Sequence, residues 1–127
     1  MAKTWCRMRE SLGFRTFSKF LFLGGDVIKR SEALYQKKLI DKIKIIFPDC
    51  FIIKNDPVLT QGIPDLLILF DPGWAMLEVK ADPRSQLQPN QEYYVEFFNN
   101  MSFCAFVNPA IEEQVLNDLQ QTFGVRG

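Results

Sequence analysis

The sequence predicts a single α/β domain, with elements in the order helix, three strands, helix, strand and helix around a mixed central sheet. Three segments carry apolar residues at helical spacing, and four short apolar runs are bounded by turn residues. A length of 127 residues with 47% hydrophobic residues suits one domain with a core. No apolar stretch approaches the roughly 20 residues that span a bilayer. The polar, basic start does not fit a signal peptide.

The first helix is predicted over residues 32–47. Ser31 suits its N-cap, and Pro48 ends it. Its apolar stripe, which we expect to be buried, consists of Leu39, Ile40, Ile43, Ile46 and Phe47. The apolar run 50–54 predicts the first strand, and a loop then leads to Gly62. A glycine there allows a positive φ or a close approach of the backbone to a ligand, or it only marks a turn.

Two further strands are predicted as a hairpin. The apolar run 66–70 and the run 74–77, which continues into the charged segment 78–80, flank an Asp-Pro-Gly turn at 71–73. Proline presets φ for such a turn, and glycine tolerates a positive φ. We therefore expect the two runs to pair antiparallel.

Charged side chains are expected to meet at one end of this hairpin. Asp65 opens the first strand and Glu78 closes the second, so antiparallel pairing puts both at the same end. Alternate side chains of a strand share a face, so Lys80 points the same way as Glu78 while Val79 points into the core. Two carboxylates beside a lysine suit a hard divalent cation and phosphodiester cleavage. The alternative is a surface salt bridge, which contributes ~0–1 kcal/mol.

The last part of the chain predicts a helix, a strand and a helix. Pro89 suits the first turn of a helix that runs to about Asn100. Gln91 leads the apolar face of this helix, which consists of Tyr94, Val95 and Phe98. The run 102–107 is apolar enough to predict a central strand. A final helix over 110–123 is expected to bury Ile111, Val115, Leu116, Leu119 and Phe123.

Missing residue types exclude several chemistries. Because the chain has no histidine, it cannot form a histidine-metal nuclease site, a Cys/His zinc site or a Ser-His or Cys-His nucleophile pair. The three cysteines, Cys6, Cys50 and Cys104, are odd in number and lack CxxC spacing. They are typical of reduced thiols in a cytoplasmic protein. Chemistry is therefore expected from carboxylates, lysine, amides and a metal ion.

Residues 1–30 are interpreted as a basic, aromatic N-terminal arm that precedes a domain over 31–127. The net charge of the chain is zero, but seven Lys or Arg against two acidic residues give this arm a charge of +5, and the remainder −5. Basic side chains interleaved with aromatic ones are typical of segments that contact nucleic acid. Packing of the aromatic side chains on the domain or on a second subunit is the alternative.

Two segments carry a resemblance to a known family. Segment 62–65 reads Gly-Ile-Pro-Asp, and segment 78–80 reads Glu-Val-Lys. The Pro-Asp of the first segment, the spacer and the second segment together resemble the signature of the PD-(D/E)XK nucleases. Together with the downstream segment 87–91 (Leu-Gln-Pro-Asn-Gln), it resembles the VRR-NUC branch, which includes small stand-alone phage nucleases. The resemblance covers residues 31–109 and implies a restriction-endonuclease-like core. Gln88 departs from the serine that is common at its place, which affects only the helix cap.

The resemblance implies a metal-dependent deoxyribonuclease. Asp65 and Glu78, with the Val79 carbonyl as a further oxygen ligand, would bind Mg²⁺ or Mn²⁺, which polarises a phosphate and lowers the pKa of a bound water. Lys80 would orient or deprotonate that water, or stabilise charge on the phosphate. Gln91 would orient the nucleophile. Hydrolysis would leave a 5′-phosphate and a 3′-hydroxyl.

Further residues are predicted to support this site. Glu32, in the first turn of the first predicted helix, would hold a second ion or its water, as the resemblance implies. Alternatively it only complements the helix dipole. DNA contacts are predicted for Arg7, Arg9, Arg15, Lys19, Lys29, Arg30, Lys80, Arg84 and Gln88.

The resemblance also implies DNA as the partner, a homodimer, and neither an organic cofactor nor a membrane. Small relatives act on branched DNA such as Holliday junctions in DNA recombination, where symmetric cleavage of two strands needs two active sites. Two alternatives stay open, namely a sequence-specific nicking or homing endonuclease, and a non-catalytic DNA-binding or assembly module that retains the nuclease fold. The expected location is the cytoplasm, that of the host cell if the chain is phage-encoded.

Overall fold

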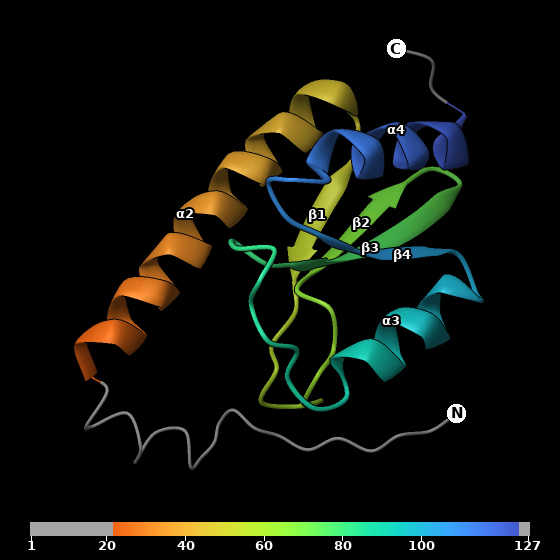
Figure 1. Cartoon of the computed structure of the whole chain (residues 1–127). Helices are drawn as coiled ribbons and strands as arrows, with labels where there is room; N and C mark the ends of the chain where they lie inside the picture. The colour runs from red at the N-terminus through yellow and green to blue at the C-terminus, as the bar shows by residue number, and fades with distance from the viewer. Residues whose placement is uncertain (1–21, 125–127) are drawn as a thin grey trace.

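The computed structural model describes residues 22–124 (Figure 1), with side chains described from residue 30 onward. The elements follow in the predicted order, which confirms the α/β domain. They are α2 (Phe22–Ile46), β1 (Phe51–Lys54), β2 (Leu66–Phe70), β3 (Gly73–Val79), α3 (Gln91–Asn99), β4 (Phe103–Val107) and α4 (Glu112–Phe123). No helix in the described range is long and apolar enough to cross a membrane.

The four strands form one mixed sheet in the order β1-β2-β3-β4. β2 pairs antiparallel with both β1 and β3, so the predicted hairpin is confirmed. β3 and β4 run parallel, and α3 lies in the connection between them. Parallel neighbours need such a long crossover, because a tight turn can only reverse the chain direction.

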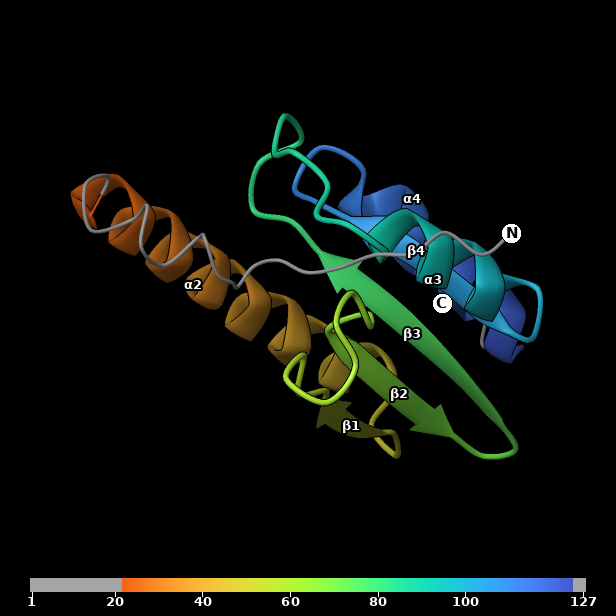
Figure 2. The same ribbon diagram turned by 90° about the horizontal axis from the view of Figure 1, so that it is seen from below.

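Helices cover both faces of this sheet (Figures 1 and 2). α2 and α4 pack on one face, and the fully buried side chains of that core include Leu39, Ile43, Phe47, Leu66, Ile68, Leu77 and Leu119. This confirms most of the predicted stripe of α2, and Ile40 and Ile46 are partly buried against it. α3 lies on the opposite face, where Phe98 meets Trp74 edge to face with ring centroids 6.3 Å apart.

Three phenylalanines close the core beside the hairpin turn. The ring of Phe47 lies edge to face with Phe70 and with Phe123, at centroid distances of 5.2 and 5.3 Å. Phe70 and Phe123 stack on each other at 5.1 Å. Aromatic pairs at these distances add to the stabilisation from area burial. The turn end of the hairpin is therefore held by apolar packing of β2, α4 and Phe47, which directly follows α2.

The first helix begins earlier than predicted, at Phe22 rather than at residue 32. It runs through Gly24 and Gly25 and includes Ser31, so the prediction of Ser31 as N-cap was wrong. No proline interrupts this stretch. A glycine costs only about 1 kcal/mol in a helix interior, which a cooperative helix of this length can absorb. The domain boundary after residue 30 stays a prediction, and α2 runs across it.

Three smaller predictions were also wrong. β4 is an edge strand of the described sheet rather than a central one. It is apolar on both sides because α3 and α4 both pack on it. α3 begins at Gln91, after Pro89, because Asn90 has a φ of 73°, which an α-helix cannot include. Ile111 precedes α4 and is exposed rather than buried.

Candidate active site

The register of the β2–β3 hairpin brings two acids together. Leu66 pairs with Leu77, so Asp65, directly before Leu66, lies opposite Glu78, directly after Leu77. The two carboxyl groups are within hydrogen-bonding reach of each other. The Val79 backbone N–H donates to Asp65 Oδ2 at 2.9 Å and fixes this side chain against β3. The acids therefore meet at one end of the sheet, as the hairpin pattern predicted.

Lys80 completes a buried charged cluster. Alternation along the strand puts Val79 in the core and directs Glu78 and Lys80 to the other face. The Lys80 ammonium lies 4.0 Å from Glu78 Oε2, and the two residues are only 8% and 2% exposed. The Lys80 N–H donates to the Val107 carbonyl at 2.9 Å, so β4 holds its backbone. Burying charges is costly, so packing alone does not explain this cluster.

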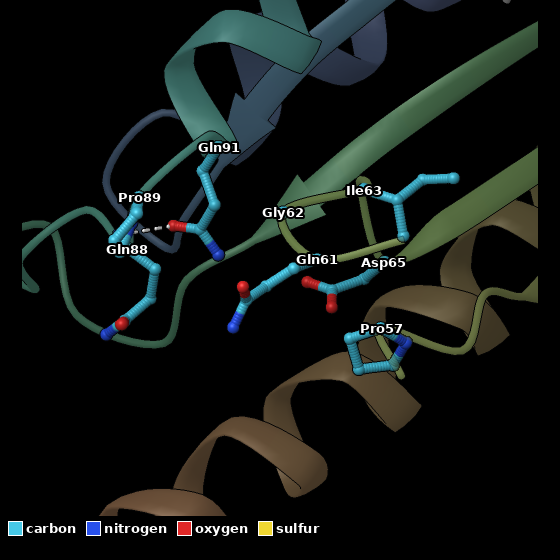
Figure 3. Close-up of a pocket in the computed structure, with 8 residues that line it drawn as sticks. All are labelled: Pro57, Gln61, Gly62, Ile63, Asp65, Gln88, Pro89 and Gln91. Atoms are coloured by element: carbon cyan, nitrogen blue, oxygen red, sulfur yellow. Dashed lines mark hydrogen bonds between the residues drawn. The ribbon is translucent and has the colours of Figure 1, made fainter. Parts of the chain in front are cut away.

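Gln91 links the first turn of α3 to the acids. Its Nε2 donates to Glu78 Oε2 at 2.8 Å, and its Oε1 accepts the Gln88 backbone N–H at 2.8 Å (Figure 3 shows the second bond). Because the oxygen already accepts from Gln88, only the NH₂ group can face Glu78. Gln91 therefore holds the Glu78 carboxylate in one orientation.

The surroundings of the two acids disfavour their ionised forms. Burial raises the pKa of Glu78 well above its ordinary value, and the charges of Asp65 and Glu32 raise it further, while the Lys80 charge opposes them. Burial also raises the pKa of Asp65, against the opposing effect of the Val79 N–H and of Lys80. Glu78 Oε1 is buried without a hydrogen-bond donor. A proton or a cation between the acids would relieve this arrangement.

The donor atoms fit a hard divalent cation. Mg²⁺ is commonly held in proteins by one or two carboxylates and keeps several waters. Asp65 and Glu78 supply two carboxylates, and Glu78 Oε1 is an acceptor without a donor. Over the described part of the chain, no group of three or more His, Cys, Asp or Glu side chains is placed to hold a metal ion. The remaining ligands would therefore be backbone, water or substrate oxygens.

A small pocket of about 60 Å³ opens beside Asp65 (Figure 3). Its walls come from the loop between β1 and β2 and from the segment that leads into α3. They consist of Pro57, Gln61, Gly62, Ile63, Asp65, Gln88, Pro89 and Gln91. Its polar side chains are three amides and one carboxylate, its other side chains are apolar, and none is basic. A polar cavity of this size has room for water or a small ligand group.

Gly62 and Asn90 join the two walls of this pocket. Gly62 has a φ of 92°, and a Cβ atom there would lie 2.5 Å from Asn90 Cβ. Asn90 Nδ2 donates to the Gln61 carbonyl at 3.4 Å. The predicted close approach at Gly62 is thus to the protein's own chain. Sequence reasoning missed Asn90, although asparagine is one of the few residues other than glycine that adopt left-handed backbone.

Glu32 lies on α2 and is partly buried. Its charge contributes to the raised pKa of Glu78, which places it in the electrostatic surroundings of the site. α2 is tied to α4 through Glu112, whose carboxylate accepts from the Tyr35 hydroxyl at 2.8 Å and pairs with Lys42. The role of Glu32 in holding an ion or its water stays a prediction.

The residues predicted to contact DNA are only partly described. Arg7, Arg9, Arg15 and Lys19 lie outside the described residues, and Lys29 lies in α2 without a described side chain. Arg30 is exposed on α2. The Arg84 guanidinium is exposed and pairs with the Asp82 carboxylate at 3.1 Å. Such a surface pair contributes only ~0–1 kcal/mol, so it leaves Arg84 available to other anions.

The comparisons with known proteins bear on the fold. No family model matches the chain, and no curated protein sequence matches it. A solved structure named "VRR_NUC domain protein" is similar, with 20% sequence identity, a TM-score of 0.56, and coverage of 75% of this chain and 89% of that chain. The chain therefore shares its restriction-endonuclease-like α/β fold with that VRR_NUC domain protein.

Proposed function

We propose that this chain is a divalent-cation-dependent nuclease that hydrolyses phosphodiester bonds in DNA. The observation that carries the proposal is the pairing register of β2 and β3, which sets Asp65 opposite Glu78 with the Lys80 ammonium 4.0 Å from Glu78. A fold shared with a VRR_NUC domain protein supports it. A structural role alone would not require three charged groups at this buried edge.

In this proposal, Asp65 and Glu78 hold the cation, with the Val79 carbonyl as a further oxygen ligand. A bound Mg²⁺ or Mn²⁺ would supply positive charge that polarises the scissile phosphate and makes water a stronger acid. The Val79 N–H fixes Asp65, and the Gln91 NH₂ group fixes Glu78, so both carboxylates are oriented before substrate binds. Gln91 acts here by positioning Glu78, in place of the predicted direct contact with the nucleophile.

Lys80 supplies the second positive charge of the site. It is held by β4 through its backbone and faces Glu78 with its ammonium group. A fixed ammonium in a site with little water stabilises negative charge that develops on a phosphate. In this role Lys80 contacts the reacting phosphate or the attacking water, and Glu32 adds a third negative charge near the cation.

The preferred DNA and the assembly are finer parts of the proposal and rest on the resemblance. One chain supplies one such set of side chains, whereas symmetric cleavage of two strands of a junction needs two. We therefore propose a homodimer that acts on branched DNA. A four-way junction compared with a linear duplex of the same sequence tests the substrate, and preference for the linear site would favour a sequence-specific enzyme.

The test of the proposed function is a cleavage assay with the full-length chain. Supercoiled plasmid, duplex and junction DNA are incubated with Mg²⁺, with Mn²⁺ and with EDTA, and products are separated by gel electrophoresis. We expect cleavage with either cation and none with EDTA. Glu78→Ala should abolish it, whereas Glu96→Ala, which removes an exposed glutamate from α3, should not.

Two results would overturn the proposal. One is wild-type-level cutting by the Glu78→Ala protein. The other is DNA binding by the wild type without cleavage under any condition and without heat of Mg²⁺ or Mn²⁺ binding in calorimetry. That second outcome would favour a non-catalytic DNA-binding module. Circular dichroism of each variant separates loss of chemistry from loss of fold.

A further inference from the structure

Lys54 is a second lysine beside the acid pair, and sequence reasoning did not single it out. It is the last residue of β1, and in the register of β1 and β2 it pairs with Leu66, the residue after Asp65. The Asn55 N–H, one residue further along, donates to the Asp65 carbonyl at 2.8 Å. The backbone therefore holds Lys54 beside the residue that begins the acid pair.

The Lys54 side chain is exposed on the α2 side of this sheet end. Ile52, two residues earlier, packs against the core under α2, and alternate side chains of a strand share a face. Lys80 is only 8% exposed, whereas Lys54 is open to water. Burial raises the pKa of Asp65, and the charge of Lys54 is one of the opposing influences that lower it. The Lys54 ammonium thus lies within electrostatic reach of the site and is accessible from outside.

An edge lysine can also serve the fold alone. β1 is at one edge of the sheet, and a lysine on such a strand discourages pairing with another chain. That role is met by a charge of either sign, and it does not depend on a neighbouring carboxylate. Binding of an anion requires a positive charge. Reversing the charge of Lys54 therefore distinguishes the two roles.

The charges around the acid pair make Lys54 important for an anionic substrate. Among the described residues, three carboxylates and two ammonium groups act on the pair or belong to it, namely Glu32, Asp65, Glu78, Lys54 and Lys80. By formal charge this set carries one negative charge, which a bound divalent cation would turn into one positive charge. Without Lys54 the set with its cation would be neutral. Lys54 therefore gives the site the sign that attracts a phosphate.

The positions of the two lysines suit two different phosphates. The pocket beside Asp65 has no basic side chain in its walls, so it offers a phosphate no ion pair. Lys54 ends β1 and Lys80 follows β3, which separates their backbones by two strand spacings, about 10 Å. Asp65, directly before β2, lies between them. A nucleic acid strand that passes the acids can therefore meet one lysine on each side.

We propose that Lys54 binds a phosphate of the DNA strand that is cut, next to the scissile phosphate, so that this strand crosses the end of the sheet from β1 toward β3. The inference rests on the proposed nuclease function and adds a substrate-binding residue to that site. Lys80 contacts the reacting phosphate, whereas Lys54 holds the neighbouring one. A contact to the phosphate backbone acts alike on all base sequences and weakens with salt.

A binding experiment tests the inference without relying on cleavage. Fluorescence anisotropy follows the binding of a labelled DNA duplex to full-length protein in EDTA over a series of KCl concentrations. For Lys54→Ala we expect about tenfold weaker binding at low salt, the effect of losing one hydrogen bond to a charged group. The slope of log affinity against log salt concentration should fall by about one. An unchanged slope in Lys54→Ala, or no binding by the wild type, would overturn the inference.

Three further variants serve as controls. Lys54→Arg keeps the charge and should restore affinity and slope, whereas Lys54→Glu should bind more weakly than Lys54→Ala. Lys44 is an exposed lysine in the last turn of α2, at the end of the sheet away from Asp65 (Figure 1). Lys44→Ala should leave the slope unchanged. An equal loss in Lys44→Ala would mean that any surface charge contributes alike, and the inference would fail. It would also fail if Lys54→Ala altered only sedimentation, which is the result expected for the edge role.

A second binding measurement locates the contact on the DNA. Duplexes that carry a neutral methylphosphonate at one linkage at a time each lack one negative charge. At one linkage, the substitution should weaken binding of the wild type and have little further effect on Lys54→Ala, because the two partners of one contact are not additive. Equal losses in both proteins at every linkage would overturn the inference.

A cleavage experiment separates this inference from the proposed function. With Mg²⁺, Lys54→Ala should raise KM about tenfold and leave kcat near the wild-type value, because the contact is made equally in the bound substrate and in the transition state. A fall in kcat with an unchanged KM would overturn the inference and leave the nuclease function standing. No cleavage of any DNA by the wild type would overturn the nuclease function, and the salt slope would still decide whether Lys54 binds a phosphate.

Discussion

The two ends of the β2–β3 hairpin are built in opposite ways. At the turn end, Phe47, Phe70 and Phe123 pack ring against ring. At the other end, Glu78 and Lys80 are buried but charged, and one carboxylate oxygen of Glu78 has no donor. The first arrangement stabilises the fold, whereas the second costs stability. Under the proposed function, the charged end carries the chemistry, and the apolar end supplies stability that the charged end lacks.

The charged end is made rigid by hydrogen bonds instead of apolar contacts. Asp65 is fixed by the Val79 N–H and Glu78 by the Gln91 NH₂ group. The pocket walls are joined at Gly62 and Asn90. Polar contacts of this kind hold side chains in one geometry even where they contribute little net stability. Substitutions at the two ends should therefore affect different measurements.

The largest effect is expected from neutralising the charged end. Asp65→Asn keeps the size of the side chain but removes a negative charge, so we expect cleavage to fall by about a thousandfold or more with little change in fold. Single-turnover cleavage at saturating Mn²⁺ measures this loss. If the cleavage rate falls by less than tenfold, the two ends of the hairpin do not differ in the way proposed.

Removing a ring from the apolar end should act on stability instead. Phe47→Ala leaves a cavity between α2, β2 and α4, and we expect the free energy of unfolding to fall by about 3–5 kcal/mol. Urea denaturation followed by circular dichroism measures it. Cleavage per folded molecule should stay near the wild-type value at low temperature. An unchanged free energy of unfolding in this variant would contradict the conclusion that the three rings stabilise the turn end of the hairpin.

Gly62 tests the link between the two pocket walls. Gly62→Ala puts a Cβ against Asn90 at a φ of 92°, which costs about 1–3 kcal/mol of strain. We expect the Gln91 side-chain amide resonances in NMR to shift, because the segment leading into α3 must move. Asn100→Ala, an exposed asparagine at the other end of α3, is the control and should leave those resonances unchanged.

Glu78→Gln should stabilise the protein in the absence of divalent cations. The substituted amide would accept from Gln91 through its oxygen and donate toward Asp65 through its nitrogen, a gain of about 1 kcal/mol at neutral pH. Because burial and Asp65 raise the pKa of Glu78 in the folded state, its protonated form favours folding at low pH. That stability is lost as pH rises through the folded-state pKa.

Thermal unfolding in EDTA across pH 4 to 8 measures this difference. As the pH rises through the folded-state pKa of Glu78, the melting temperature of the wild type should fall relative to that of Glu78→Gln. The two melting temperatures should converge at the acid end of the range. Added Mn²⁺ should raise the melting temperature of the wild type only. Parallel curves at all pH values would show that the Glu78 carboxyl is not under electrostatic strain.

The smallest effect concerns the two described thiols. Cys104 is buried in β4 next to the charged end, and burial together with the charge of Glu78 raises its pKa to about 12. Cys50, directly before β1, is partly exposed. In the native protein we expect iodoacetamide to modify Cys50 much faster than Cys104, as read by peptide mass spectrometry. Comparable rates would indicate that the sheet opens near Glu78.

Sequence reasoning succeeded where the signal is local. The Asp-Pro-Gly turn predicted the hairpin, and the alternation of side chains along a strand predicted which of them share a face. These two signals alone place Asp65, Glu78 and Lys80 together. It failed where tertiary contacts decide. The edge position of β4 could not be predicted, because helices on both faces make an edge strand as apolar as a central one. The contact of Gly62 with Asn90 joins two loops far apart in sequence, and a single chain carries no signal for such a pair.

The most direct measurement of the central claim is anomalous diffraction from crystals of the full chain grown with Mn²⁺. The account predicts an anomalous peak between the carboxylates of Asp65 and Glu78, and no peak there in Glu78→Gln crystals grown in the same way. A wild-type map with Mn²⁺ bound elsewhere, or with nothing between these two side chains at saturating Mn²⁺, would contradict it.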